Sequence, residues 1–209
     1  MATKKKDEND VKDIVVKLNL RKVTVPIVGT NQLIVSRFDE KCKQEIAEAA
    51  PGKLKQGKGK KAVDSPEEQY KRSIYYLSDG KRYGFPAVAF KAAMVRAGKE
   101  LYDMPMMRTK MLIRVIADDP ETGYVEIKGK PEMREDMVRV GGINKVACPR
   151  YRAAFPVWSA NLTIEYLEDA ISEEQIVGLV GAAGFCCGIG EWRPEKANSG
   201  SFGTWTVNR

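Results

Sequence analysis

Histidine is absent from this sequence of 209 residues. Its absence excludes Ser-His-Asp and Cys-His nucleophilic catalysis. It also excludes the HExxH zinc site, the zinc-deaminase signature and the commonest general acid–base group near neutral pH. Any catalysis would therefore depend on carboxylates, lysine, tyrosine or a thiol.

Cysteine is scarce, and long apolar runs are missing. The four cysteines show no CxxC spacing, which argues against a zinc ribbon or a redox motif; they are Cys42, Cys148, Cys186 and Cys187. We expect reduced thiols in a cytoplasmic protein that uses neither a metal nor a cofactor. No stretch approaches the ~18 apolar residues of a membrane span. Residues 1–10 lack the apolar core of a secretory signal.

Basic residues outnumber acidic ones by 35 to 28, which gives a formal charge of +7. They concentrate in residues 53–61, 81–110 and 130–152. Residues 81–110 hold seven basic and two acidic side chains, and residues 130–152 hold six and three. Basic loops beside exposed aromatic rings are typical of a groove that follows phosphates and stacks bases. The alternative is ordinary solubility charge on a solvated surface.

The hydrophobic pattern predicts alternating strands and helices. The main predicted elements are strands over 14–29, 111–117, 124–129, 154–166 and 202–207, and helices over 85–101 and 172–185. This order is a β-α-β-β-α-β unit, so we expect an α+β protein with a ferredoxin-like or RRM-like antiparallel sheet and helices on one face.

The rest of the chain is expected to be a tail and insertions in one domain. Residues 1–10 read as a disordered tail, and residues 11–209 as a single domain with insertions at about 36–83 and 128–153. A helix is expected to end near Ala50, before a basic loop over 52–61, and Ser65-Pro66 begins another helix. Residues 130–153 read as irregular.

A glycine-rich segment, 184–203, separates the last predicted helix from the last strand. Its glycines permit close backbone approach, and its N–H groups can form an anion-binding concavity. Trp192 and Phe202 could stack on bases, while Arg193 and Lys196 could pair with phosphates. The alternative is a plain helix C-cap followed by a turn. It is not a Walker A loop, because no GKS or GKT triplet is present.

The order of elements and the motif at 188–203 resemble the RAMP superfamily, RRM-like proteins that include the Cas7-type backbone subunits of CRISPR complexes. These proteins carry a glycine-rich loop between the second helix and the fourth strand. The resemblance implies binding of RNA or single-stranded nucleic acid along the sheet and glycine loop, often in a side-by-side array. Members that cleave RNA often use a histidine, so its absence here argues against cleavage.

A second resemblance, to uncharacterised proteins encoded by bacteriophages and prophages, carries no function. It rests on Thr24–Gly29 followed by Ile34–Phe38, on Gly84–Ala87 and on Gly188–Pro194. If the protein is encoded by a phage, its expected compartment is the bacterial host cytoplasm.

Three other residue groups have structural explanations that we favour. For one set of aromatic residues we expect packing in the core or an interface, with base stacking as the minority alternative; the set is Tyr70, Tyr75, Tyr76, Tyr83, Phe85 and Tyr102. Core filling is favoured over a protein contact for the methionines Met104, Met106, Met107 and Met111. Solvated turn carboxylates are favoured over metal ligands for Asp118, Asp119, Glu121, Glu132, Glu135 and Asp136.

The leading hypothesis is a non-catalytic protein that binds single-stranded RNA or DNA and oligomerises along the strand, without a membrane partner. The proposed interface consists of Lys53, Lys55, Lys58, Lys60, Lys61, Arg139, Lys145, Arg150, Arg152, Gly188, Gly190, Trp192, Arg193, Lys196 and Phe202. The alternative is a phage structural or assembly protein whose glycine loop and methionine segment contact other subunits. A metal-dependent nuclease using Asp118 and Asp119 is the third hypothesis.

Overall fold

The computed structural model describes residues 18–37, 64–140, 146–196 and 200–208. The predicted tail at 1–10, the helix expected to end near Ala50 and the basic loop over 52–61 lie outside these ranges, as does Lys145. The predicted ligands Lys53, Lys55, Lys58, Lys60 and Lys61 therefore stay predictions. So does the domain boundary at residue 11.

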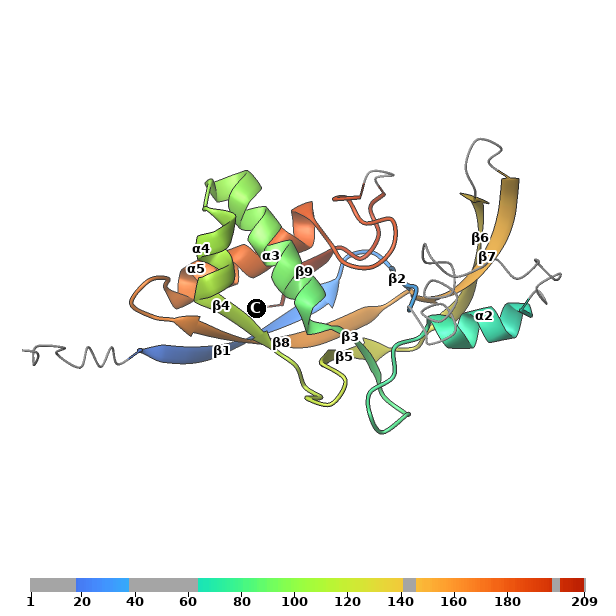
Figure 1. Ribbon diagram of the computed structural model, residues 1–209, viewed down its shortest axis with the longest axis horizontal. Coiled ribbons are helices and arrows are strands. Elements are labelled where there is room, and N and C mark those ends of the chain that lie inside the picture. The colour runs from blue at the N-terminus through green and yellow to red at the C-terminus, as the bar shows by residue number, and fades with distance from the viewer. Residues whose placement is uncertain (1–17, 38–63, 141–145, 197–199, 209) are drawn as a thin grey trace, which may run out of the picture.

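The central unit is the predicted β-α-β-β-α-β arrangement. Its elements are β1 (Leu20–Gly29), α3 (Ala87–Tyr102), β4 (Ile113–Ile116), β8 (Trp158–Leu167), α5 (Glu173–Cys186) and β9 (Trp205–Val207). The strands lie in the order β4-β8-β1-β9, and each neighbouring pair is antiparallel. Helices α3 and α5 cover one face of this sheet (Figure 1). The α+β fold class predicted from the sequence is confirmed.

Period-two alternation directs one face of the central strands into the core. In β1, the buried residues Val25 and Ile27 alternate with the exposed residues Thr24 and Pro26. Along β8, every second residue from Trp158 to Tyr166 is buried. The helices begin where the sequence indicates: α5 follows a capping box formed by Ser172 and Gln175, which satisfies two otherwise free backbone N–H groups.

Two insertions extend the sheet and build a second one. Before α3 come β2 (Leu33–Val35), α2 (Pro66–Ser73) and β3 (Tyr83–Pro86); after it come α4 (Met106–Leu112), β5 (Tyr124–Gly129), β6 (Glu132–Val140) and β7 (Val146–Phe155). Strand β5 connects β8 to β3, while β2, β7 and β6 form a separate sheet. The β6–β7 pair projects beyond the main sheet, with α2 beside it (Figure 1).

The expectation that 130–153 is irregular was wrong. Strands β6 and β7 pair antiparallel from Glu132↔Ala154 to Val140↔Val146. Much of this pair is exposed on both faces, so its strands lack the alternating apolar residues that make a half-buried strand recognisable. The single strand expected over 154–166 is likewise interrupted, because the chain bends at Pro156 and Val157 between β7 and β8.

Several apolar side chains that were expected to be buried are exposed. The helical spacing of residues 172–185 predicts that Phe185 is buried in one stripe with Ile176 and Leu179, but its side chain is 82% exposed. Met107 and Met111 are 68% and 77% exposed, whereas Met104 packs against the core as expected. The difference arises because residues 106–112 form helix α4, which directs Met107 and Met111 outward and buries Thr109 instead. The helical spacing of residues 85–101 also predicts that Leu101 belongs to the apolar face of α3, but its side chain is exposed.

Candidate functional site

The glycine-rich segment forms a loop that is held tightly between α5 and β9. Helix α5 ends at Cys186, so the loop begins three residues later than residue 184. The backbone N–H of Glu191 donates to the Ile34 carbonyl (2.9 Å), and the N–H of Gly203 donates to the Gln32 carbonyl (2.8 Å). These bonds attach the loop to the segment around β2, beside the second sheet.

Glycine is required at two positions where the loop crosses other backbone. Gly190 has φ +79°, and a Cβ there would collide with the Ile34 carbonyl oxygen. Gly203 has φ +66°, and a Cβ there would collide with the Ile189 carbonyl oxygen. Close packing and left-handed backbone therefore explain these glycines. The predicted contact of Gly188 and Gly190 with nucleic acid stays a prediction.

Both predicted phosphate ligands of the loop already have acidic partners. Arg193 Nε lies 3.2 Å from Glu195 Oε2, and Arg193 Nη1 donates to the Gly190 carbonyl (3.0 Å). Lys196 Nζ lies 2.6 Å from Glu191 Oε2. The two cations and two anions cancel in charge. A phosphate could bind Arg193 or Lys196 only by sharing or exchanging these partners.

The aromatic residues of the loop meet the β6–β7 hairpin. Trp192 and Phe202 lie with ring centroids 6.0 Å apart. The Arg134 Cζ atom lies 5.5 Å from the Trp192 centroid and 4.9 Å from the Phe202 centroid. Arg152 Cζ lies 6.0 Å from the Trp192 centroid. We call Arg134, Arg152, Trp192 and Phe202 the arginine–aromatic cluster.

The hairpin register explains why two arginines share this cluster. Arg134 and Arg152 are directly opposite each other on β6 and β7, and Asp136 is opposite Arg150 on the same face. Like charges in opposite positions destabilise a sheet. Asp136 offsets part of this repulsion because its Oδ1 accepts from Arg134 Nε at 2.8 Å. The cluster keeps an excess positive charge, which aromatic faces accommodate favourably.

Among the described residues, two buried polar atoms at the cluster have no hydrogen-bond partner. They are Asp136 Oδ2 and Arg152 Nη1. The expectation of a solvated turn acid was wrong for Asp136, which is only 5% exposed. An unsatisfied buried polar atom costs about 1–3 kcal/mol. Within the described residues, Arg152 Nη1 therefore lacks a hydrogen-bond acceptor, and Asp136 Oδ2 lacks a donor.

The cluster extends toward solvent through Arg150. Its side chain is exposed, and it shares the face of the hairpin that carries Arg134 and Arg152. Arg139 lies further along β6, but its side chain is outside the described part. Predicted site residues Arg150, Arg152, Trp192 and Phe202 are thus brought together. The sequence prediction omitted Arg134 and Asp136 from the site, because their place in it depends on the register of the hairpin.

The face of the main sheet opposite the helices is polar rather than aromatic. Thr24 and Thr163 hydroxyls lie 3.1 Å apart across β1 and β8. Lys22 and Arg114 both approach Glu165, at 3.6 and 3.4 Å. In the part of these strands that the structure describes, no aromatic platform faces outward. The half-buried rings that have arginines beside them, Trp192 and Phe202, lie at the loop–hairpin junction rather than on this face.

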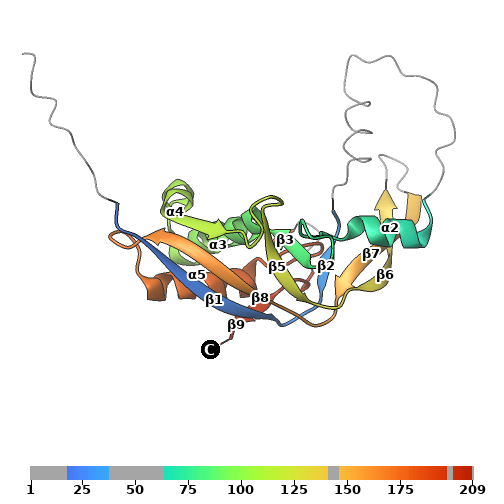
Figure 2. The same ribbon diagram turned by 90° about the horizontal axis from the view of Figure 1, so that it is seen from below.

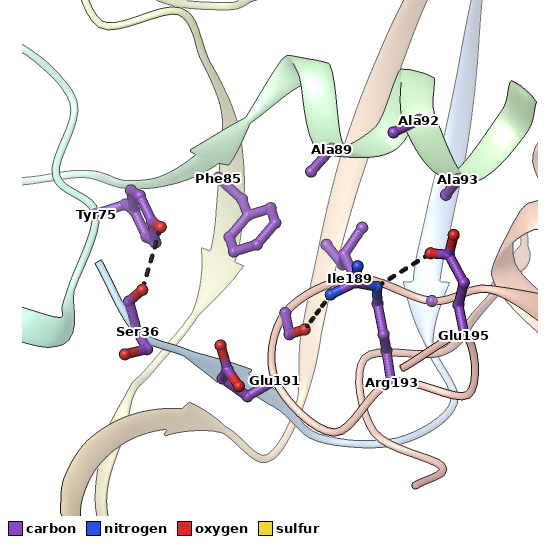
Figure 3. A pocket seen from close by; sticks show the side chains of 12 residues that line it. Ser36, Tyr75, Phe85, Ala89, Ala92, Ala93, Ile189, Glu191, Arg193 and Glu195 are labelled. Atoms are coloured by element: carbon purple, nitrogen blue, oxygen red, sulfur yellow. Dashed lines mark hydrogen bonds and ion pairs between the residues drawn. The ribbon is translucent and has the colours of Figure 1, made fainter. Parts of the chain in front are cut away.

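A cavity of about 170 Å³ lies on the other side of the glycine loop, against the start of α3 (Figure 3). Tyr75, Phe85 and Glu191 are among the residues that line it. The Tyr75 hydroxyl donates to the Ser36 carbonyl at 3.4 Å. Burial raises the pKa of Tyr75 above its usual value, and nearby Tyr124 and Glu191 raise it further. Tyr75 therefore remains a neutral hydrogen-bond donor at physiological pH.

Most of the aromatic residues between Tyr70 and Tyr102 pack against other residues of the protein, as we expected from the sequence. Tyr75 makes edge contacts with Phe85 and Tyr124, each at 5.3 Å, and Tyr76 lies 5.6 Å from Tyr83. Tyr102 is the exception and is exposed.

Asp119 also departs from the expectation of a solvated turn acid, because it is buried. Its Oδ2 accepts from the Ser78 backbone N–H at 2.6 Å and from the Thr122 hydroxyl at 2.9 Å. These bonds stabilise a turn. Within the described ranges, no group of three or more metal-ligating side chains comes together. No helix in the described part is long and apolar enough to cross a membrane.

Comparison with known proteins shows a shared fold. A chain of the Type III-B Cmr-beta complex, solved bound to cognate target RNA, matches over 91% of this chain with a TM-score of 0.51 and 9% identity. This chain spans 59% of that chain's length. Cmr6 from Pyrococcus furiosus matches over 92% of this chain and 100% of its own, with a TM-score of 0.43 and 10% identity. No protein-family model and no curated protein sequence matches.

The match to the Cmr-beta chain confirms the RAMP resemblance at the level of the fold. The further resemblance to phage and prophage proteins stays a prediction.

Proposed function

We propose that this protein binds single-stranded nucleic acid, with RNA as the preferred substrate, at the junction of the glycine loop and the β6–β7 hairpin. The observation that carries the proposal is the arginine–aromatic cluster. Arg134 and Arg152 face each other beside Trp192 and Phe202, and Arg152 Nη1 has no partner within the described residues. Guanidinium groups beside aromatic rings supply both the phosphate contacts and the stacking surfaces that single strands require.

The arrangement also suggests how a strand would lie. Arg150 is exposed, so a phosphate reaches it first along the hairpin face. The rings of Trp192 and Phe202 are half-buried and already have Arg134 nearby. A base would therefore stack on the exposed side of a ring or displace the guanidinium. Arg152 Nη1 is buried, so a phosphate oxygen supplies its missing acceptor only when the Arg152 side chain turns toward the strand.

RNA is preferred in the proposal for two reasons. The Cmr-beta complex, whose chain shares this fold, was solved bound to cognate target RNA. In addition, a ribose 2′-hydroxyl both donates and accepts hydrogen bonds, so it could donate to Asp136 Oδ2 once the side chains that bury this oxygen move aside. The predicted lysines at 53–61 and 145 remain proposed phosphate contacts.

We further propose that binding occurs without cleavage and that several copies assemble on one strand. The sequence contains no histidine, which supports a binding role over general acid–base chemistry. Origin in a phage or prophage, and with it a location in the bacterial host cytoplasm, also belongs to the proposal.

The test is a fluorescence-anisotropy titration of labelled single-stranded RNA and DNA with nucleic-acid-free protein across a salt series. Arg150→Gln should reduce the slope of log affinity against log salt concentration by about 0.7, because each phosphate contact to a single strand contributes about that much to the slope. Phe202→Leu should weaken binding without altering that slope, because stacking releases no counterions.

Lys81→Gln is the matched control, since it removes one exposed charge from a turn away from the cluster. It should leave both affinity and slope close to wild type. The proposal fails if folded wild-type protein binds neither RNA nor DNA at low salt. It also fails if Lys81→Gln weakens binding as much as Arg150→Gln does.

A further inference from the structure

Exposed apolar residues gather on helix α4, at one edge of the main sheet. Met107 and Met111 are one turn apart on α4, and both are mostly exposed. The exposed residues Leu101 and Tyr102, at the end of α3, precede them in the chain. Arg108 and Lys110 are exposed on the same helix. Contiguous exposed apolar surface of this kind marks an interaction site more often than a free surface.

A groove of about 480 Å³ lies between α5 and β9, at the opposite edge. Gly178 and Gly181 leave its wall without side chains, and a Cβ added at Gly178 would meet no atom within 4 Å. Phe185 follows on the same helical face and is 82% exposed. Glu173 and Glu174 also line the groove.

The two surfaces are complementary in shape, polarity and charge. Methionine side chains are long and unbranched, so they fit an irregular groove and make favourable contacts with aromatic rings. The α4 surface adds two basic residues, and the groove adds two acidic ones. A symmetric contact of α4 with α4, or of α5 with α5, would instead bring like charges together.

Their positions allow the contact to repeat. Strands β4 and β9 lie on opposite sides of the β8–β1 pair, with α4 next to β4 and α5 next to β9. Figure 2 shows α4 and β9 on opposite sides of these central strands. A protein that uses one surface therefore keeps the other free. Such head-to-tail contacts generate rings or open filaments.

We propose that copies of this protein associate head to tail. The α4 surface of one copy (Met107, Met111, Arg108, Lys110) sits in the α5–β9 groove (Gly178, Gly181, Glu173, Glu174) of the next copy and against Phe185, which lies beside that groove. The contact lies away from the arginine–aromatic cluster and does not require nucleic acid. It specifies the assembly that the proposed function includes. Its test uses nucleic-acid-free protein, so its failure leaves the binding proposal intact.

The decisive experiment mixes two variants that are each blocked on one surface. Met111→Glu blocks the α4 surface, because it would place a negative charge next to Glu173 and Glu174 of the neighbouring copy. Gly178→Leu fills the groove, and it should be tolerated because the site is open and Leu favours a helix more than Gly does. By sedimentation velocity across a concentration series, wild-type protein should form growing assemblies, while each variant alone should remain monomeric.

A one-to-one mixture of the two variants should form a dimer and nothing larger. Each retains one intact surface, and only one complementary pair can form. Met137→Glu makes the same chemical change at another exposed methionine, on the hairpin, and should assemble like wild type. Unchanged circular dichroism and urea midpoints for the variants exclude unfolding as the cause.

Three results would overturn the proposal: a wild-type protein that stays monomeric at every concentration, blocked variants that still assemble, or a mixture that stays monomeric. If only one of the two variants still assembles, the contact is symmetric and uses the surface that this variant keeps intact.

Discussion

The Arg134 guanidinium carbon lies 4.9 Å from the centre of the Phe202 ring, and this contact connects the β6–β7 hairpin to the loop after α5. The two residues are far apart in the sequence and belong to different parts of the fold. Because both are half-buried, the contact is screened less than one on the surface. It fixes the relative position of the two parts of the candidate interface.

A double-mutant cycle measures this connection. Arg134→Met and Phe202→Leu should each lower the free energy of unfolding, with a coupling of about 0.5–2 kcal/mol between them, as expected for a partly buried cation–π pair. Urea unfolding of the two single variants, the double variant and wild type gives the value. Arg114→Met paired with Phe202→Leu is the control, because Arg114 lies on the main sheet and pairs with Glu165. Its effects should add within about 0.5 kcal/mol, and equal coupling in both cycles would contradict the prediction.

The glycine loop allows a matched test of backbone and packing. Gly203 and Gly80 both have φ +66°, but a Cβ at Gly80 would meet nothing within 4 Å. Gly80→Ala should therefore show the conformational cost alone, about 1–2 kcal/mol. Gly203→Ala should cost clearly more, because its Cβ would overlap the Ile189 carbonyl and break the loop's attachment. Urea midpoints measure both; equal losses would show that the loop accommodates the added atom.

The arrangement of the central unit followed from the sequence because its elements are amphipathic or capped. The Ser172 capping box marks the start of α5. Alternation marks β1 and β8, where one face is buried against helices. The hairpin was missed because its buried face contains Arg152 and Asp136 rather than apolar residues. Residue type alone does not reveal such burial.

The candidate site was predicted in part for a related reason. Trp192 and Phe202 stand out in a glycine-rich loop, and Arg150 and Arg152 stand out in a basic segment. Their meeting depends on the hairpin register and on the attachment of the loop to β2, which are tertiary features. The same dependence hid Arg134, whose cross-strand position opposite Arg152 places it over the rings.

The Asp119 turn should make stability depend on pH under acidic conditions. A backbone hydrogen bond from Ser78, with support from Thr122 and Glu121, lowers the pKa of Asp119 from 3.8 to about 2. A carboxyl whose pKa is lower in the folded state stabilises that state above its unfolded pKa, and the benefit is lost as pH falls from 3.8 toward 2. Asp119→Asn should therefore be less stable than wild type at pH 6, with a difference that shrinks below pH 4.

Urea midpoints at a series of pH values measure this difference. Glu121→Gln removes a charge from the same turn without removing the side chain that accepts the Ser78 bond, and it serves as the control. A difference between Asp119→Asn and wild type that stays constant down to pH 2 would contradict the assigned role of the carboxylate.

The cysteines provide a chemical probe of the interface. Cys187 is buried, and burial, with a smaller contribution from Glu195, raises its pKa to about 11. At pH 8 roughly a thousandth of this thiol is ionised, so it should resist alkylation. Cys148 is exposed on β7, on the face that carries Arg150 and Arg152. Iodoacetamide at pH 8 should therefore modify Cys148 and spare Cys187 in the native protein, as located by peptide mass spectrometry.

Single-stranded RNA should slow the modification of Cys148 if the strand follows the hairpin face. The expected protection should disappear at high salt, because the phosphate contacts weaken there. The Arg150→Gln variant should show less protection than wild type at the same RNA concentration, whereas Lys81→Gln should retain it. Unprotected Cys148 in an RNA-saturated complex would place the strand away from this face. Because Cys148 and Arg150 lie on one face of the same strand, this measurement locates binding on the hairpin independently of the affinities.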